Sequence, residues 1–280
     1  MKFDNDNKDI AWCPGCGNFG ILNALKQALE ITGYTNQETM IVAGIGQAAK
    51  AAQYINANSF TGLHGRALPA ATGIKLSNKE LKVIVTSGDG DIYGEGGNHF
   101  LHAIRRNPDI TVIVFNNMIY GLTKGQASPT SQSNFIGKMQ PHKNENEPFN
   151  PIAVAIAQNI SFAARAFTQD VEKTRDIMLE AIEHKGFALV DVLTPCVSFN
   201  KANTYQWFKE NTYYIENHDP YDRGAAIRLE FESEKFPLGV IFKQDKTVLE
   251  ESEMYIKQTA EPLYRHEVDF EKIGNLISNP

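Results

Sequence analysis

The stretch VIVTSGDGDIYGEGGNHF (residues 83–100) decides the fold of this chain, together with ITVIVFNNMIYGLTKGQ (residues 110–126). Each opens with a nearly continuous run of β-branched and aromatic residues, which is typical of a strand buried on both faces of a parallel sheet. The first run ends in Gly88-Asp89-Gly90 and the second ends in Asn116-Asn117. Because the carboxyl ends of parallel strands meet at one edge of a sheet, we expect Asp89 and Asn117 to lie close together.

Two further apolar runs, TMIVAGIG (39–46) and FALVDVL (187–193), predict additional buried strands. Helix-like segments with apolar residues at three- and four-residue spacing lie between the strands, at residues 19–32, 96–107 and 174–186. Such strand–helix alternation predicts right-handed crossovers with helices on both faces of the sheet. The fold class is therefore expected to be α/β with a parallel sheet.

Two regions break this alternation. Residues 122–150 are polar and rich in Pro, Gly, Ser and Asn, and a loop of that length is usually functional or disordered. After Cys196 the sequence becomes aromatic and charged. We therefore expect residues 1–203 to form one domain and residues 204–280 to form a C-terminal extension that packs on the domain or on a partner subunit.

The composition excludes several classes of function. The chain has 280 residues, 42% of them hydrophobic, and a formal net charge of -6. This is long enough for one large α/β domain, and the acidic balance argues against a nucleic-acid surface. No apolar run approaches the ~20 residues that span a bilayer, so no membrane association is expected. The polar amino terminus shows no secretory signal, and three cysteines make no disulfide framework, so we expect a cytoplasmic protein.

The two strand-end turns carry the chemistry of a phosphate and metal site. Glycines let backbone N–H groups approach an anion, and the start of the following helix adds its positive end. Asp89, Asn117 and a main-chain carbonyl would supply the hard oxygen ligands that Mg²⁺ prefers. Each motif alone is also an ordinary turn, but two of them at the ends of buried strands favour a single site. A nicotinamide-binding protein is disfavoured because no G-x-G-x-x-G follows the first strand.

Several longer motifs point to a known family. WCPGCGNFGIL (12–22), GIGQAAK (44–50), LHGRALPAATGIKLSN (63–78) and NNMIYGLTKGQASPTS (116–131) occur in this order. Together with the GDG stretch, they resemble the β subunit of archaeal-type 2-oxoacid:ferredoxin oxidoreductases, from Trp12 to about Asn203. The pair of strand-end turns resembles the thiamine diphosphate signature. The resemblance implies a diphosphate-type, thiamine diphosphate-binding domain.

The resemblance also implies roles for individual residues. Mg²⁺ would be held by Asp89, Asn117 and the carbonyl of Ile119. Lys50 and His64 would have catalytic roles, with Lys50 facing the carboxylate of a 2-oxo acid substrate. Contacts to thiamine diphosphate are implied for Ile45, Gly46, Gln47, Ala48, His64, Gly90, Asp91, Gly121 and Leu122.

The cysteines indicate a redox or metal centre whose fourth ligand is missing. The family binds one 4Fe-4S cluster in this subunit through four cysteines, and Cys13, Cys16 and Cys196 correspond to three of them. The fourth position is Gln47, a poor iron ligand beside thiolate. The alternatives are a 4Fe-4S cluster completed by water, by Gln47 or by another donor, a 3Fe-4S cluster, no stable cluster, a zinc site, or merely buried thiols. We favour a 4Fe-4S cluster with altered ligation.

The family's activity is the oxidative decarboxylation of 2-oxo acids to acyl-coenzyme A and CO₂, with electrons passing through the cluster to ferredoxin. The glutamate that faces the cofactor's aminopyrimidine lies in a separate domain in this family. The resemblance therefore implies an α, or fused α–γ, partner subunit and an inactive isolated chain. Alternatives are a subunit of another thiamine diphosphate enzyme, such as an indolepyruvate oxidoreductase or a non-oxidative decarboxylase, and a non-catalytic, metal-stapled binding subunit.

Overall fold

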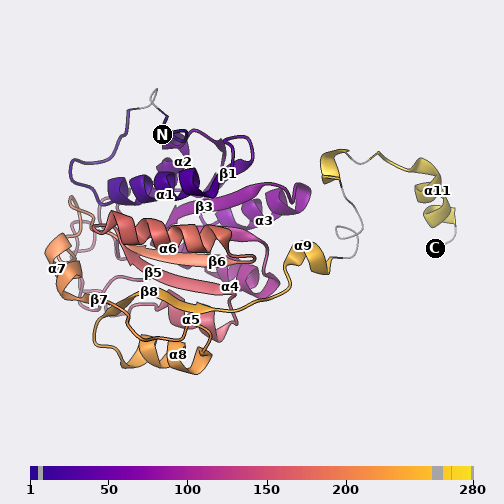
Figure 1. The fold of residues 1–280 in the computed structure, drawn as a ribbon. Helices are drawn as coiled ribbons and strands as arrows, with labels where there is room; N and C mark the ends of the chain where they lie inside the picture. The colour runs from indigo at the N-terminus through magenta and orange to yellow at the C-terminus, as the bar shows by residue number, and fades with distance from the viewer. Residues whose placement is uncertain (6–8, 254–260, 266, 279–280) are drawn as a thin grey trace.

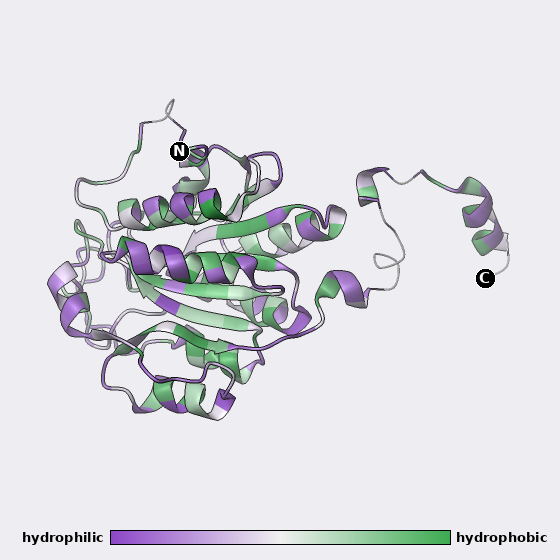
Figure 2. Ribbon diagram, viewed as in Figure 1, coloured by the Kyte–Doolittle hydropathy of each residue, from purple (hydrophilic) through white to green (hydrophobic). Residues whose placement is uncertain are grey.

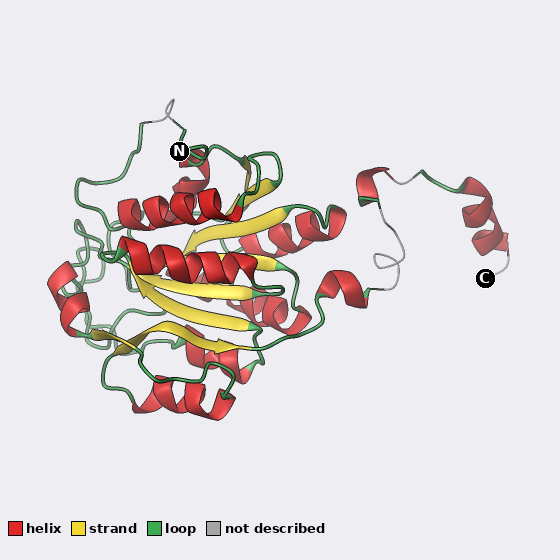
Figure 3. Ribbon diagram, viewed as in Figure 1, coloured by secondary structure: helices red, strands yellow, loops and turns green. Residues whose placement is uncertain are grey.

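A single sheet organises the protein. Within residues 1–5, 9–253, 261–265 and 267–278, which the computed structural model describes, the strands form an eight-stranded sheet of order β2-β1-β3-β4-β6-β5-β8-β7 (Figures 1 and 3). The strands are β1 (Thr39–Ala43), β2 (Asn58–Thr61), β3 (Lys82–Gly88), β4 (Ile110–Asn116), β5 (Phe162–Phe167), β6 (Ala188–Leu193), β7 (Thr212–Tyr214) and β8 (Phe236–Lys243). The helices are α1 (Asn18–Thr32), α2 (Ala51–Tyr54), α3 (Ala67–Ser77), α4 (Gly97–Arg106), α5 (Pro151–Ala157), α6 (Val171–Glu183), α7 (Tyr205–Glu210), α8 (Arg223–Glu232), α9 (Leu249–Ser252) and α11 (Phe270–Ser278). Two 3-10 turns, η1 (Ala48–Lys50) and η3 (Leu263–Arg265), and a π-helical turn, η2 (Gly90–Glu95), complete the chain.

The predicted α/β fold is confirmed, and its centre is parallel. The four strands predicted from apolar runs are β1, β3, β4 and β6, which are consecutive in the sheet and pair in parallel. Their residues are almost entirely buried. In the pairing of β3 with β4, Gly88 lies opposite Phe115, so the two chains leave the sheet side by side.

Helices cover both faces of the sheet. Alternate side chains of β3 enter opposite cores, with Ile84 packing among residues of α1, α2 and α6. Val83 and Val85 pack instead with α3, α4, α5 and α8. Figure 2 shows the strands as mostly hydrophobic and the helices as hydrophilic on their outer sides. Because helices cover both faces of the sheet, the central strands are apolar on both sides, and this explains their unbroken apolar sequences.

The sequence did not indicate every strand. β2 (NSFT) is a short edge strand whose residues are all exposed, so it carries no apolar signal. β5 (FAARAF) is buried, but Arg165 interrupts its apolar run. The guanidinium of Arg165 forms two hydrogen bonds with Glu230 of α8, at 2.7 and 2.8 Å. That partner is distant in sequence, so the local pattern gave no reason to bury an arginine.

The predicted extension, residues 204–280, supplies further elements of the same sheet. β8 pairs antiparallel with β5 and parallel with β7, and α8 packs beside β8. In Figure 1, α11 lies away from the sheet, and none of its residues is buried. Residues 254–260, 266 and 279–280 of this predicted segment lie outside the described residues. None of the described helices combines the length and apolar character needed to cross a bilayer.

Two truncations test how much of this segment the fold needs. Ending the chain after Arg265 removes α11, which buries nothing, so the free energy of unfolding should change by less than about 0.5 kcal/mol. Ending it after Asn203 removes β8 and Glu230, which leaves the edge of β5 unpaired and Arg165 buried without its partner. We expect that chain to aggregate or to lose cooperative urea unfolding. Cooperative, soluble behaviour of the shorter chain would contradict this description.

Candidate active site

One cavity at the carboxyl edge of the sheet brings together nearly all of the predicted site residues. Its wall includes Cys13, Cys16, Ile45, Gly46, Gln47, Ala48, His64, Asp89, Gly90, Asp91, Asn117, Ile119, Gly121, Leu122 and Cys196. Lys50 is the exception, because it ends η1 and is not among the residues that line the cavity. The predicted role of Lys50 toward the substrate carboxylate therefore stays a prediction from the family resemblance. Most of the other residues meet because they follow the ends of parallel strands, whereas Cys13 and Cys16 lie just before α1.

Asp89 directly follows β3, and two hydroxyl groups hold its side chain through one carboxylate oxygen. Its side chain is buried, and both Ser128 Oγ (2.5 Å) and Thr130 Oγ1 (2.7 Å) donate to its Oδ2 atom. Burial raises the pKa of Asp89 to about 6, while the two hydroxyl donors act in the opposite direction. Because both hydroxyls donate to Oδ2, neither of them occupies the Oδ1 atom.

The chain after β4 makes a constrained turn at the same place. Met118 has a φ of 56°, in the left-handed region that a non-glycine residue rarely adopts. The turn is secured by the N–H of Ile119, which donates to Asn117 Oδ1 at 3.1 Å, and by Asn200 Nδ2, which donates to the Asn117 carbonyl at 3.1 Å. Strained backbone held by several contacts is typical of functional sites. The turn is therefore built to present the polar groups of residues 117–119 at the cavity.

Asp91 organises the cavity wall. Its Oδ1 atom accepts hydrogen bonds from the N–H groups of Ile45 (3.0 Å) and Gly65 (2.9 Å), and its Oδ2 atom accepts one from Ser87 Oγ (2.7 Å). His64 Nδ1 also lies 2.9 Å from Oδ1. With this many donors the carboxylate is fully used within the protein. The Asp91 side chain joins three segments of the site. The predicted contact of Asp91 with the cofactor was assigned to the backbone of its turn, and it stays a prediction.

His64 is positioned by that contact. Its side chain is 41% exposed, and Nδ1 is committed to Asp91, which leaves Nε2 for a ligand. With Nδ1 as the donor to Asp91, Nε2 can donate to a phosphate only when the imidazole is protonated.

Glycines allow close packing at the turns that line the cavity. A Cβ atom at Gly44 would collide with the carboxylate of Asp91, and one at Gly90 would collide with the ring of Tyr120. Gly46 has a φ of 126°, which side-chain-bearing residues seldom adopt. Packing within the protein therefore requires glycine at residues 44 and 90, while the position of a Cβ at Gly46 is in open space. η2 begins at Gly90. Tight glycine turns that lead into a helical segment suit a diphosphate group.

A close contact between two backbone segments brings the three cysteines to the same part of the cavity wall. Gly17 and Gly20 pack against the chain that follows β5 and β6, and a Cβ at Gly17 would collide with Thr194 and Pro195. This contact sets the Cys13–Cys16 loop against Cys196 at the cavity wall. From α7, the hydroxyl of Tyr205 donates to the Gly15 carbonyl at 3.2 Å and holds the loop from the other side. Burial raises the pKa of the Cys16 thiol to about 11, so iron binding there would release a proton.

Gln47 lies at the same wall as the three cysteines. The indole Nε1 of Trp12 donates to the Gln47 carbonyl at 2.9 Å, while the side-chain Oε1 is buried and has no hydrogen-bond partner within the described structure. The described parts of the chain contain no group of three His, Cys, Asp or Glu side chains that could hold a single metal ion. A cluster differs from a single ion because it spreads its thiolate ligands over several iron atoms.

Sequence reasoning missed three residues of the site. Ser128 and Thr130 come from the long loop between β4 and α5, and Asn116 is the last residue of β4. The only signal was the Ser-Pro-Thr sequence in a loop already expected to be functional. Hydroxyl residues are common in loops, so nothing local marked these two as partners of Asp89.

Two protein families match parts of this chain and indicate its class of enzyme. Residues 36–192, more than half of the chain, match the family described as "Thiamine pyrophosphate enzyme, C-terminal TPP binding domain". Residues 196–258 match the family that describes the C-terminal part of the pyruvate ferredoxin oxidoreductase β chain. The fold is therefore that of the thiamine diphosphate-binding domain of these enzymes.

Individual relatives narrow the class to a family. A 2-oxoacid:ferredoxin oxidoreductase β subunit of Aeropyrum pernix is 43% identical over 244 residues, which cover 82% of this chain and 77% of that protein. The corresponding β subunit of Saccharolobus solfataricus is 46% identical over 213 residues, covering 75% and 70%. A solved structure from Magnetococcus marinus, a 2-oxoglutarate:ferredoxin oxidoreductase with 2-oxoglutarate, coenzyme A and succinyl-CoA bound, matches with a TM-score of 0.92 at 32% identity and covers 100% of this chain and 97% of that chain. The chain belongs to the family of 2-oxoacid:ferredoxin oxidoreductase β subunits, as its sequence motifs predicted, and is thus an oxidoreductase subunit.

The close approach at Gly17 generates a prediction. Gly17→Ala should lower the free energy of unfolding by about 1–3 kcal/mol, because its methyl group would overpack against Thr194 and Pro195. Gly73→Ala, in α3 with open space around it, is the matched control and should be neutral or stabilising by about 0.5–1 kcal/mol. Urea unfolding of the two variants measures both values. Equal stability of the two variants would show that Gly17 does not require this packing.

Proposed function

We propose that this chain binds thiamine diphosphate through Mg²⁺, carries an iron–sulfur cluster, and oxidises 2-oxo acids to acyl-coenzyme A and CO₂ with ferredoxin as electron acceptor. The observation that carries this proposal is that one cavity contains the strand-end oxygen donors, the glycine turns and the three cysteines. The proposed Mg²⁺ ligands are Asp89, Asn117 and the Ile119 carbonyl. The proposed diphosphate contacts are the turns at residues 45–48, 90–91 and 121–122, with His64 beside them.

The residues present fit such a cofactor. The two hydroxyl donors of Asp89 both use Oδ2, which leaves Oδ1 for a cation, and the turn at Gly46 borders open space. Thiamine diphosphate, when bound, would supply the carbanion and electron-sink chemistry of the decarboxylation. The chain's own task is to fix the diphosphate end, to hold His64 through Asp91, and to exclude water from the site.

The cysteines fit a one-electron acceptor beside that site. A Cβ atom at Gly121, in the proposed diphosphate loop, would lie 3.6 Å from Cys196 Sγ. The two centres are therefore contiguous, which suits electron transfer from the substrate. Three thiolates suit iron–sulfur chemistry, and we propose a 4Fe-4S cluster whose fourth site is not a cysteine. The proposed location is the cytoplasm, where such thiols remain reduced.

The assembled enzyme is proposed to need an α subunit. This chain supplies a single sheet with one cofactor edge, so the glutamate that faces the aminopyrimidine must come from a partner. Apolar side chains at and near the mouth of the cavity support this, because Leu63 is 76% exposed and Leu122 is 44% exposed. We further propose that residues 1–203 carry the cofactor site and that residues 204–280 buttress it.

The metal site predicts the effect of one substitution. Asp89→Ala should abolish retention of thiamine diphosphate by the complex with its α partner, because the metal loses its only carboxylate among the three proposed ligands. Asp176→Ala, an exposed carboxylate on α6, serves as control and should bind normally. Isothermal titration with Mg²⁺ and thiamine diphosphate measures both. Near-normal affinity in Asp89→Ala would mean that the site is wrongly assigned.

The cysteine site predicts that one substitution will make the iron–sulfur cluster more stable in air. Gln47→Cys should supply the missing fourth thiolate and make the cluster more resistant to oxygen. The measurements are iron and sulfide content, the EPR spectrum, and the decay of visible absorbance in air, each compared with the unsubstituted complex. If the spectrum and the decay rate do not change, residue 47 is not at the fourth iron.

A further inference from the structure

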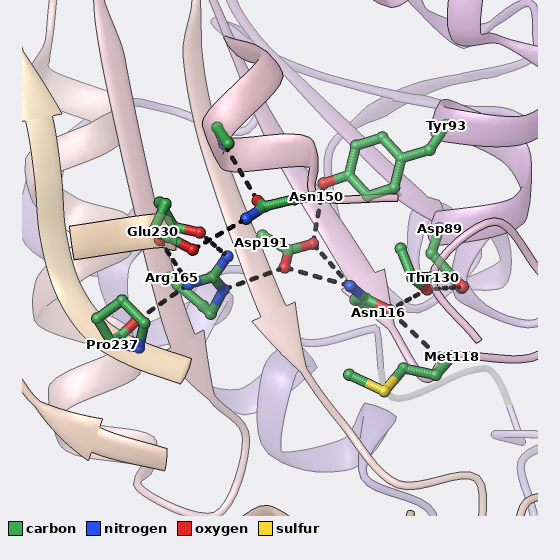
Figure 4. A network of polar contacts seen from close by, with 11 residues as sticks. Asp89, Tyr93, Asn116, Met118, Thr130, Asn150, Arg165, Asp191, Glu230 and Pro237 are labelled. Carbon is green, nitrogen blue, oxygen red and sulfur yellow. Dashed lines mark hydrogen bonds and ion pairs between the residues drawn. The ribbon is translucent and has the colours of Figure 1, made fainter. Parts of the chain in front are cut away.

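A chain of buried polar side chains leads from the cavity wall into the interior of the protein (Figure 4). It begins at Asp89 and continues through Thr130, whose Oγ1 atom lies 2.7 Å from Asp89 Oδ2 and 2.8 Å from Asn116 Oδ1. Asn116 Nδ2 in turn donates to both oxygens of Asp191, each at 3.2 Å. The proposed metal ligand is thus connected to a carboxylate on β6 that is not part of the cavity wall.

Asp191 is itself held in place. The Tyr93 hydroxyl donates to its Oδ1 atom at 2.9 Å, and Arg165 Nε lies 3.6 Å from its Oδ2 atom. Arg165 is fixed on its other side by the two hydrogen bonds to Glu230 of α8. All four side chains are almost completely buried.

The orientation of the Asn116 side-chain amide links the contacts of Asp191 to the proposed metal site. A carboxylate only accepts hydrogen bonds, so Asp191 requires the NH₂ group of Asn116 to point toward β6. The Oδ1 atom of Asn116 must then point the other way, where it meets Thr130 and accepts a hydrogen bond from the Met118 N–H at 3.2 Å. Thr130 has a single hydroxyl proton, which it gives either to Asn116 Oδ1 or to Asp89 Oδ2, so the orientation of Asn116 bears directly on how Asp89 is held. Met118 lies between Asn117 and Ile119. Through one amide, Asp191 therefore sets both halves of the proposed metal site.

The charges of the buried network also favour the binding of a cation at its cavity end. The network holds three carboxylates, those of Asp89, Asp191 and Glu230, but only one guanidinium. Arg165 directs two N–H groups to Glu230, and its Nε has no hydrogen-bond partner in the described part of the chain. Buried ionic groups seldom improve stability over apolar ones, and buried charges are paired or coordinate metals. A cation at the cavity end would balance the excess of carboxylates.

We propose that Asp191 is a positioning residue for the metal and diphosphate site, and that Arg165 and Tyr93 hold Asp191 for this purpose. The inference rests on the proposed function, because it assumes that Asp89 and Asn117 bind the cofactor's metal. Asp191 acts through Asn116 and touches no ligand. The network also explains why α8, far away in the sequence, is tied to the cofactor edge of the sheet.

The test is the Mg²⁺ affinity of the complex with the α partner at saturating thiamine diphosphate. Asp191→Asn keeps the size of the side chain but introduces an NH₂ group toward the donors of Asn116 and Tyr93. We expect the Kd for Mg²⁺ to rise by about 10- to 100-fold, as is typical for partners of metal ligands. Asp109→Asn is the matched control, because this half-buried carboxylate pairs with Lys75 at the opposite end of β4. Its Kd should not change.

A second pair of variants keeps the test valid if Asp191→Asn does not fold. Thr130→Val removes the hydroxyl that joins Asn116 to Asp89 and should weaken Mg²⁺ binding to a similar degree. Thr111→Val is its control, since this buried hydroxyl on β4 donates to the Ala181 carbonyl, at 3.2 Å, away from the network. With Mn²⁺ in place of Mg²⁺, the EPR spectrum of the bound ion should change in Thr130→Val and remain unchanged in Thr111→Val. A purely structural role would lower the unfolding midpoint without changing this spectrum.

The outcomes separate the inference from the proposed function. If Asp191→Asn or Thr130→Val binds Mg²⁺ with the unsubstituted Kd and an unchanged Mn²⁺ spectrum, while Asp89→Ala loses binding, only the positioning role is wrong. If Asp89→Ala also binds normally, the metal site itself is misplaced and both proposals fail. Weakened binding in Asp191→Asn and Thr130→Val, with both controls normal, supports the positioning role.

Discussion

The parallel pairing of β3 with β4 is the constraint on which the rest of the site depends. Its register places Gly88 opposite Phe115, so the chain leaves both strands at one edge and at one level. Asp89 and Asn117 follow immediately and reach the same cavity. A shift of one residue would turn one of these side chains to the other face of the sheet, because neighbouring residues of a strand point in opposite directions. The buried apolar residues of the two strands oppose such a shift and so protect the chemistry as well as the fold.

The remaining parts of the molecule are arranged to keep that edge rigid. The loop between β4 and α5 has no regular secondary structure, yet it folds back so that its hydroxyls hold Asp89. The chain after β1 and the loop after β2 are joined to η2 by the Asp91 carboxylate. The loop that contains Cys13 and Cys16 packs closely against the chain after β6, because Gly17 has no side chain. Each connection joins segments that are far apart in sequence, so the cavity is a product of the whole sheet rather than of any one motif.

Much of this could be predicted from sequence, for definite physical reasons. β1, β3, β4 and β6 are apolar on both faces, and the residues that follow them must share one edge, so Asp89 and Asn117 could be placed together. β5 could not be predicted, because its central Arg165 is buried with carboxylate partners that are distant in sequence, Glu230 of α8 and Asp191 of β6. Ser128 and Thr130 were missed because a hydroxyl in a polar loop has no distinguishing pattern. Lys50 came from family resemblance alone, and the structure does not bring it to the cavity.

The central claim is that Asp89 and Asn117 share one divalent cation at the carboxyl edge of β3 and β4. The most direct measurement is anomalous diffraction from crystals of the complete complex soaked with Mn²⁺ and thiamine diphosphate. The account predicts a single Mn²⁺ peak at about the ligand distance of Mg²⁺, near 2.1 Å, from a side-chain oxygen of each residue and from the Ile119 carbonyl. A metal peak that contacts only one of the two side chains, or that lies at another edge of the sheet, would contradict it.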